Sequence, residues 1–252
     1  MRWVEETGST NADLLEAAAR GEPDGVVLVA DHQTAGRGRL DRTWRAPPGS
    51  SLLVSVLLRP NLGAVDAHLL TTAAGVAAVD ACGDLTGATV GLKWPNDLVV
   101  PAGHRLAGRK LGGILAEARL QGPTVEAVVV GMGLNVEWSF ELPPELAEVA
   151  TALDHLGARP VEREDLLVAW LTRFDTVLAD LDEPGGRDRL FDAVRRVSAT
   201  IGRPVRAELP DGRALEGTAV DVAANGHLVV GPADGGPSVE IAVGDVVHLR
   251  QR

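Results

Sequence analysis

Two apolar stretches with very little chain between them constrain the fold most. The segments at 109–120 and 124–134 both have the composition of strands, and only Gln121, Gly122 and Pro123 separate them. Three residues are too few for the crossover helix that a parallel pair requires. We therefore expect antiparallel neighbours. This favours an α+β chain, with a mixed or antiparallel sheet flanked by helices, over a doubly wound parallel sheet.

Other segments before residue 200 supply further strands and the flanking helices. The runs at 25–33 and 50–60 are apolar, β-branched and bounded by Gly or Pro, as expected of buried strands joined by a loop. Small and aliphatic residues at helical spacing predict a helix over 64–83. In the stretch 163–181 the apolar side chains fall on one helical face, which we expect to pack on the sheet. A shorter helix is predicted at about 187–198.

The sequence changes character near residue 200. Turn signals follow one another closely, with PDG at 210–212, NG at 225–226 and PADGGP at 232–237. Five short strands in about fifty residues indicate a small β-barrel. We therefore predict a larger domain over 1–200 and a small β domain over 201–252.

Composition excludes several classes of protein. The 252 residues carry a formal net charge of −11, which argues against broad nucleic-acid binding because affinity for phosphate backbones depends on accumulated Lys and Arg. No apolar run approaches the ~20 residues of a membrane-spanning helix, and the N-terminus lacks a signal-peptide pattern, so we expect a cytoplasmic location and no membrane partner. The single Cys82 lies in an apolar helical pattern and is interpreted as a small buried hydrophobe.

The stretch DHQTAGRGRLDRTW (31–44) gathers positive charge on an acidic chain. Its arginines and glycines are Arg37, Arg39, Arg42, Gly36 and Gly38. Guanidinium groups bind carboxylates and phosphates in bidentate fashion, and glycines let the main chain approach a ligand. The alternative is a solvated basic loop. Trp44 either offers a flat face to a base or lies in the core.

The segment GSTNAD (8–13) precedes an apolar run and predicts the start of a helix. Thr10 is the expected N-cap, with Asp13 three residues later. The functional interpretation is that Ser9, Thr10 and Asn11 present hydroxyl and amide groups to a polar small molecule at this helix end. The two interpretations are compatible.

Two lysines lie at strand ends. Lys93 opens the string KWPND, where a proline stops the strand before an Asn-Asp turn. Lys110 begins an otherwise apolar strand beside small residues, a plausible position for stabilising an anionic transition state. Asn135 ends the partner strand and can present both a donor and an acceptor to the edge of adenine.

Metal and nucleophile chemistry find little support. The six histidines are scattered without metal-ligand spacing, so we expect no zinc site. The sequence also contains no GxSxG elbow and no evident Cys-His pair for acyl-enzyme chemistry. Arg, Lys, Asn and Gly remain, and these residue types suit the handling of anions without a protein nucleophile.

Taken in series, GSTN, QTAGRGR, KWPND, GRKLGGIL and GMGLN resemble the biotin-protein ligase family. The five motifs are distributed along residues 8–136. The resemblance implies a class II synthetase-like catalytic domain followed by an SH3-like barrel. It also implies two reactions: biotin and ATP form biotinyl-5′-adenylate and pyrophosphate, and then a lysine of a biotin carboxyl carrier protein or domain of an acyl-CoA carboxylase attacks the adenylate. The family uses Mg²⁺ with ATP, and such an ion needs no dedicated cage of protein ligands.

The same resemblance assigns roles to individual residues. Biotin binding is implied for Ser9, Thr10, Asn11, Gln33, Gly36, Arg37, Gly38, Arg39 and Lys110. ATP or adenylate binding is implied for Arg39, Arg42, Trp44, Lys93, Asn96, Lys110 and Asn135. The catalytic set is Lys110, Arg37, Arg39 and Lys93, with Lys110 between the biotin carboxylate and the α-phosphate. Asp97 is given a turn-forming or metal-side role.

Three alternatives stay open at this point: a lipoate-type protein ligase, a biotin-responsive repressor without catalysis, and a ligand-binding module without turnover. Because GSTN begins at Gly8, we expect the ligase-only form of the family, without an N-terminal DNA-binding domain and without DNA as a partner. The sequence leaves the oligomeric state open.

Overall fold

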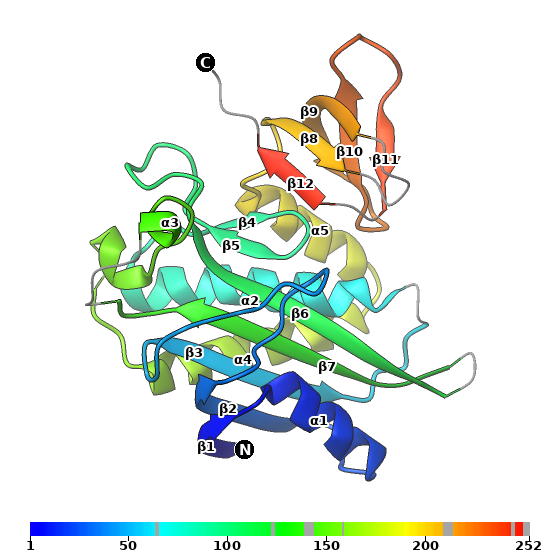
Figure 1. The fold of residues 1–252 in the computed structure, drawn as a ribbon. Coiled ribbons are helices and arrows are strands. Elements are labelled where there is room, and N and C mark those ends of the chain that lie inside the picture. Colours follow the sequence, from blue (N-terminus) through cyan, green and yellow to red (C-terminus); the bar gives the residue numbers. More distant parts are fainter. Residues whose placement is uncertain are drawn as a thin grey trace.

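The larger of two sheets forms the centre of the molecule. A computed structural model describes residues 1–63, 66–121, 124–138, 144–157, 159–208, 214–242 and 245–248. Within them the sheet has the order β1-β2-β3-β7-β6-β5-β4 (Figure 1). Its strands are β1 (Arg2–Thr7), β2 (Val26–Gln33), β3 (Ser51–Leu58), β4 (Gly91–Lys93), β5 (Asp97–Val99), β6 (Lys110–Gln121) and β7 (Thr124–Asn135).

Strand pairing confirms the predicted mixed sheet. β6 and β7 are antiparallel, with Cα partners running from Gly112 and Leu134 to Gln121 and Thr124. Only β1 and β2 are parallel among the described pairs, and the helix α1 (Thr10–Ala19) connects them. Residues 122–123 of the predicted turn lie outside the described residues.

Helices cover both faces of this sheet (Figure 1). α1 packs on one face, and α2 (His68–Thr86) and α4 (Arg163–Leu181) lie on the other. The remaining helices are α3 (Pro144–Ala147), the 3-10 helix η2 (Leu153–Leu156) and α5 (Gly186–Val197). The helices predicted from apolar spacing are thus confirmed as α2, α4 and α5.

The packing of α4 differs from the expectation that its apolar face lies on the sheet. That face packs mainly along α2, where Trp170 donates its indole N–H to Ala74 O at 3.1 Å. α4 also contacts β3. The difference arises because α2 is rich in buried alanine, which lets a second helix approach closely.

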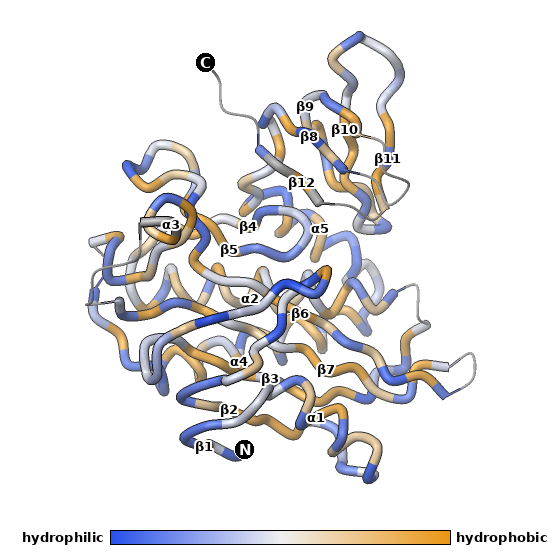
Figure 2. Tube along the Cα trace, viewed as in Figure 1, coloured by the Kyte–Doolittle hydropathy of each residue, from blue (hydrophilic) through white to orange (hydrophobic). Residues whose placement is uncertain are grey.

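Much of the large sheet is hydrophobic (Figure 2). Alternation along its strands divides the apolar side chains between two clusters. Leu28, Leu57 and Val129 face α1 and pack with its Leu14. The neighbouring residues in the strands face α2 and α4 and form the larger cluster, which includes Cys82. Cys82 is 0% exposed, which confirms the buried position expected from the sequence, and this burial raises the pKa of its thiol to about 12.

The C-terminal residues form a second sheet, as predicted. Its five described strands are antiparallel and follow the order β11-β10-β9-β8-β12 (Figure 1). They are β8 (Pro204–Glu208), β9 (Ala214–Val222), β10 (Leu228–Pro232), β11 (Val239–Ile241) and β12 (Asp245–His248). The turn predicted at 210–212 lies outside the described residues. No helix in the described parts of the chain is long and apolar enough to cross a membrane.

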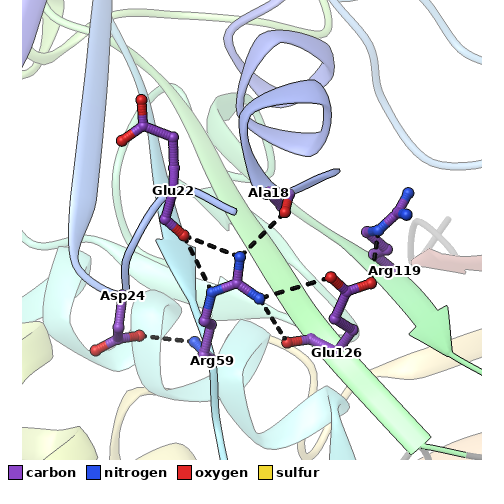
Figure 3. Close-up of polar contacts among 6 residues, drawn as sticks. All are labelled: Ala18, Glu22, Asp24, Arg59, Arg119 and Glu126. Carbon is purple, nitrogen blue, oxygen red and sulfur yellow. Dashed lines mark hydrogen bonds and ion pairs between the residues drawn. The ribbon is translucent and has the colours of Figure 1, made fainter. Parts of the chain in front are cut away.

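Arg59 ties the end of α1 to the sheet (Figure 3). Its guanidinium donates to the carbonyl oxygens of Ala18, Glu22 and Glu126, at 2.9 to 3.3 Å. The Arg59 backbone N–H also donates to Asp24 Oδ1 at 2.6 Å. Because the last carbonyls of a helix lack partners within it, these contacts fix α1 where it leaves the sheet.

Candidate active site

The N-terminus of α1 forms the first wall of the site. The helix begins at Thr10, and Ser9 is the N-cap, accepting from Ala12 N at 3.5 Å. The expectation that Thr10 would be the N-cap is therefore wrong by one residue. Thr10 is instead hydrogen-bonded sideways: its backbone N–H donates to Gln33 Oε1 at 2.8 Å, and its hydroxyl lies 2.7 Å from Ser55 Oγ.

Asn11 is held by the middle of the sheet. Its side-chain amide accepts from Ser55 Oγ at 2.6 Å and donates to Glu117 Oε2 at 2.8 Å and to Leu115 O at 3.2 Å. Gly131 on β7 makes this position possible, because a Cβ there would overlap Asn11 Oδ1. The glycine is thus required by the close approach of α1 to β7.

The β2–β3 loop (residues 34–50) crosses over β7 and β6, and its outer part is largely hydrophilic apart from the exposed Leu40 at the turn (Figures 1 and 2). Part of it is a small hairpin: Arg37 and Thr43 form an antiparallel bridge, and Gly38 N donates to Arg42 O at 2.7 Å. Leu40 and Asp41 at the turn have φ of 55° and 57°, a left-handed conformation in which non-glycine residues are strained. The loop therefore stores strain next to the site.

Trp44 follows the hairpin and lies against β7. A Cβ at Gly133 would come within 2.6 Å of the Trp44 ring, so this glycine also permits close packing. Lys110 Nζ lies 5.6 Å from the centre of the same ring, within the range of a cation–π contact. The Trp44 indole N–H is buried and has no hydrogen-bond acceptor among the described residues.

Lys110 and Asp97 form an ion pair at the start of β6. The Lys110 Nζ to Asp97 Oδ1 distance is 2.6 Å, and both side chains are partly exposed. Beside them Asn96 accepts from Arg39 NH1 at 3.3 Å and donates to Ile114 O at 2.7 Å. The turn after Lys93 thus meets both the β2–β3 loop and β6.

One cavity joins these parts. Of the residues assigned to the site from the sequence, it is lined by Ser9, Thr10, Asn11, Gln33, Arg37, Gly38, Arg39, Arg42, Trp44, Lys93, Asn96 and Lys110. Asp97 is the one carboxylate among the described lining residues. The cavity therefore presents uncharged polar groups at the α1 end and several cations on the other side.

Two of the assigned residues lie outside this lining. Gly36 is buried and its carbonyl accepts from Trp44 N at 2.9 Å, which places it behind the hairpin. Asn135 is 2% exposed, with its amide bonded to Ser51 Oγ at 3.2 Å and to Thr151 O at 2.9 Å. A role for Asn135 at the edge of a base stays a prediction.

The C-terminal sheet also reaches the site. Trp94 donates its indole N–H to Gly226 O at 2.9 Å and its backbone N–H to Thr200 Oγ1 at 3.0 Å. Val246 of β12 lines the cavity itself. Next to it, burial and then the charges of Lys93 and Arg203 lower the pKa of His248 to about 4. The second sheet therefore supports the turn that carries Lys93 and Asn96.

Sequence reasoning missed Ser55 and Glu117. Ser55 is fully buried in the apolar strand SLLVSVLL, and a hydroxyl in the middle of such a strand was a usable signal. Glu117 had no comparable signal, since its partners Arg37 and Asn11 are 80 and 106 residues away in the chain. Only the folded arrangement identifies it as part of the site.

Comparisons with known proteins agree with this geometry. Residues 4–135 match the biotin/lipoate A/B protein ligase family, and residues 200–249 match the biotin protein ligase C terminal domain. The chain is 40% identical to a biotin–[acetyl-CoA-carboxylase] ligase of Mycobacterium tuberculosis, over 98% of this chain and 88% of that protein. It is 37% identical to the bifunctional ligase/repressor BirA of Escherichia coli strain K12, over 81% of this chain and 60% of that protein.

Among solved structures, the biotin protein ligase of Aquifex aeolicus in complex with biotin and ATP superimposes with a TM-score of 0.81. The two are 26% identical, and the match covers 99% of this chain and 98% of the other. The shared fold thus extends over both sheets. Together with the family match over more than half of the sequence, this means that the chain belongs to the biotin/lipoate A/B protein ligase family.

Proposed function

We propose that this protein is a biotin–[acetyl-CoA-carboxylase] ligase, which activates biotin with ATP as biotinyl-5′-AMP and transfers it to a lysine of a biotin carboxyl carrier domain. The observation that carries the proposal is the single cavity between α1 and the β2–β3 loop. One side offers hydroxyl and amide groups to an uncharged polar ring, and the other offers cations to two anions. The names of the relatives support biotin as the substrate.

The cations answer the main difficulty of the first reaction. A biotin carboxylate must approach the α-phosphate of ATP, and two unit charges about 4 Å apart repel by roughly 4 kcal/mol at an effective dielectric of 20. Lys110 lies at the mouth of β6 and Lys93 at the end of β4, and both line the cavity. In our proposal Arg37 and Arg39 join them from the hairpin and stabilise the charge of the transition state.

The adenine side is assigned to Trp44. Its ring lines the cavity, and a flat aromatic face can stack on a base. Arg42 and Asn96 line the same part of the cavity and complete the proposed adenylate contacts.

The residues present fit a magnesium ion that is held mostly by phosphates and water. No three His, Cys, Asp or Glu side chains in the described part of the chain are grouped to hold a metal. Asp97 is the one carboxylate among the described residues that line the cavity, and the Asn96 side chain lies beside it. Mg²⁺ keeps several waters and one or two carboxylates at nucleotide sites, and it would neutralise phosphate charge here.

The acceptor, the domain boundary and the cellular location complete the proposal. The proposed acceptor is a lysine of a biotin carboxyl carrier domain, and this is supported by relatives that are named for acetyl-CoA carboxylase. A boundary between residues 200 and 201 is supported by the end of α5 at Val197 and the start of β8 at Pro204. A cytoplasmic location stays a prediction of the sequence.

Pyrophosphate exchange tests the proposal directly. The protein is incubated with ATP, Mg²⁺ and labelled pyrophosphate, in parallel with biotin, with lipoate and without an acid. We expect label to enter ATP only with biotin. Exchange with lipoate alone would identify a lipoate ligase, and biotin binding without exchange would identify a binding module.

A further inference from the structure

Glu117 connects the α1 side of the site to the β2–β3 loop. It lies on β6 beneath the hairpin and outside the lining of the main cavity. Its two carboxylate oxygens have different partners: Oε1 accepts from Arg37 NH1 at 3.3 Å, and Oε2 accepts from Asn11 Nδ2 at 2.8 Å. One side chain thus joins two structural elements that contact the same cavity.

This connection extends a path of hydrogen bonds across the site. Gln33 accepts from Thr10, the Thr10 and Ser55 hydroxyls are 2.7 Å apart, and Ser55 donates to Asn11. Asn11 then donates to Glu117. Because the side chains along this path share hydrogen bonds, a shift of Asn11 changes the position of the carboxylate that contacts the loop.

The ion pair between Glu117 and Arg37 is strong enough to favour one position of the hairpin and weak enough to break and re-form. The Arg37 side chain is 52% exposed and that of Glu117 is 26% exposed, and solvent screening keeps the contribution of such a pair small. Arg37 has five N–H donors, so the contact through NH1 leaves others for a ligand. The side chain is therefore oriented towards the cavity before an anion arrives.

We propose that Glu117 is a positioning residue, which holds the hairpin through Arg37 and is coupled to the biotin side of the cavity by its hydrogen bond from Asn11. The inference rests on the proposed function, because it takes the anion at Arg37 to be the biotinyl adenylate. With ligand bound, Glu117 keeps the hairpin closed over the adenylate and slows its escape into water.

Two substitutions separate the contacts of Glu117. Glu117→Gln keeps an oxygen that accepts from Asn11 but removes the charge that attracts Arg37. We expect bound adenylate to be lost about two- to fivefold faster, the ratio that 0.4 to 1 kcal/mol gives, with the KM for biotin within twofold of wild type. Glu117→Ala removes both contacts, so the KM for biotin also rises.

The measurement is a double-mutant cycle with Arg37→Ala, with the lifetime of preformed adenylate as readout. If Glu117 acts through Arg37, then Glu117→Gln has little further effect when Arg37 is already alanine. Glu5→Gln, which removes an exposed carboxylate on β1, is the matched control and should keep the wild-type lifetime.

A ligand-free readout distinguishes failure of this inference from failure of the proposed function. Amide hydrogen exchange of residues 36–44 should be faster in Glu117→Gln than in wild type, with α4 unchanged as an internal reference. Three results would overturn the positioning role. They are equal amide exchange in wild type and Glu117→Gln, equal adenylate lifetimes in these two proteins, and additive free-energy effects of the two substitutions in the cycle. If the wild-type protein forms no adenylate, yet residues 36–44 exchange faster in Glu117→Gln than in wild type, the proposed function is rejected. The contact between Glu117 and the hairpin is then still supported.

Discussion

The contact between Gly131 and Asn11 supports the sharpest prediction about biotin. In Gly131→Ala the new Cβ would lie 2.9 Å from Asn11 Cγ, whereas ordinary contacts between carbon atoms begin near 3.5 Å. Asn11 must therefore move by at least about 0.6 Å. The displacement breaks or stretches its hydrogen bonds to Ser55 and Glu117, and each buried polar group left unsatisfied costs about 1 to 3 kcal/mol.

We expect this cost to appear in ligand binding as well as in stability. If about 1.4 to 2.8 kcal/mol of it falls on the bound state, affinity for biotin drops roughly 10- to 100-fold. Titration calorimetry with biotin measures the affinity, and urea unfolding measures the stability. Gly83→Ala on α2 is the control, because its nearest neighbour would lie at 3.9 Å and alanine favours a helix. A Gly131→Ala protein that binds biotin as tightly as wild type would refute the placement of Asn11 in the biotin site.

Three further predictions concern catalysis, stability and pH. Lys110→Ala should lower biotin-dependent pyrophosphate exchange by roughly 10²-fold or more, and a near-wild-type rate would remove Lys110 from its role. Arg59→Met should destabilise the protein to urea by about 2 kcal/mol through the lost carbonyl contacts, whereas Arg119→Met, which breaks only an exposed pair, should cost at most about 1 kcal/mol (Figure 3). Because the pKa of His248 is lowered in the folded protein, the unfolded chain binds a proton at this histidine at a higher pH than the folded chain does. Its contribution to stability is therefore complete above pH 6.5 and is lost as the pH falls towards 4, and urea unfolding of His248→Gln at pH 7 and pH 4.5 should lack this pH-dependent component.

Local patterns were sufficient to predict most of the fold. The three residues between the predicted segments 109–120 and 124–134 left only an antiparallel pairing, and apolar spacing located α2, α4 and α5 within a few residues. The strand β1 was not predicted, because its parallel partner β2 lies beyond α1 and the pairing leaves no mark on the short stretch RWVEET. Periodicity also does not tell whether an apolar helical face packs on a sheet or on another helix. For this reason the apolar face of α4 was expected on the sheet, although it packs mainly on α2.

The site was predictable where residue types carry their chemistry with them. Arginine, lysine and the hydroxyls of GSTN indicate anion and polar-ligand binding in any context, and the cavity collects nearly all of them. Positions that depend on distant partners were not predictable. Asn135 has the chemistry to read a base, yet its amide is directed to Ser51 and Thr151 by the packing of β7.

Two carboxylates, Asp97 and Glu117, balance the charge of cations that line the cavity. Asp97 neutralises Lys110, and Glu117 neutralises Arg37, so neither cation faces an uncompensated charge. Both pairs are partly exposed and weak, so an anionic ligand can displace Asp97 from Lys110 and can bind the N–H donors of Arg37 that Glu117 does not use. A carboxylate or phosphate that enters the cavity therefore gains cations whose side chains are already oriented, and the entropy of ordering them is lost at folding rather than at binding. The net charge of −11 makes the surface as a whole unattractive to polyanions.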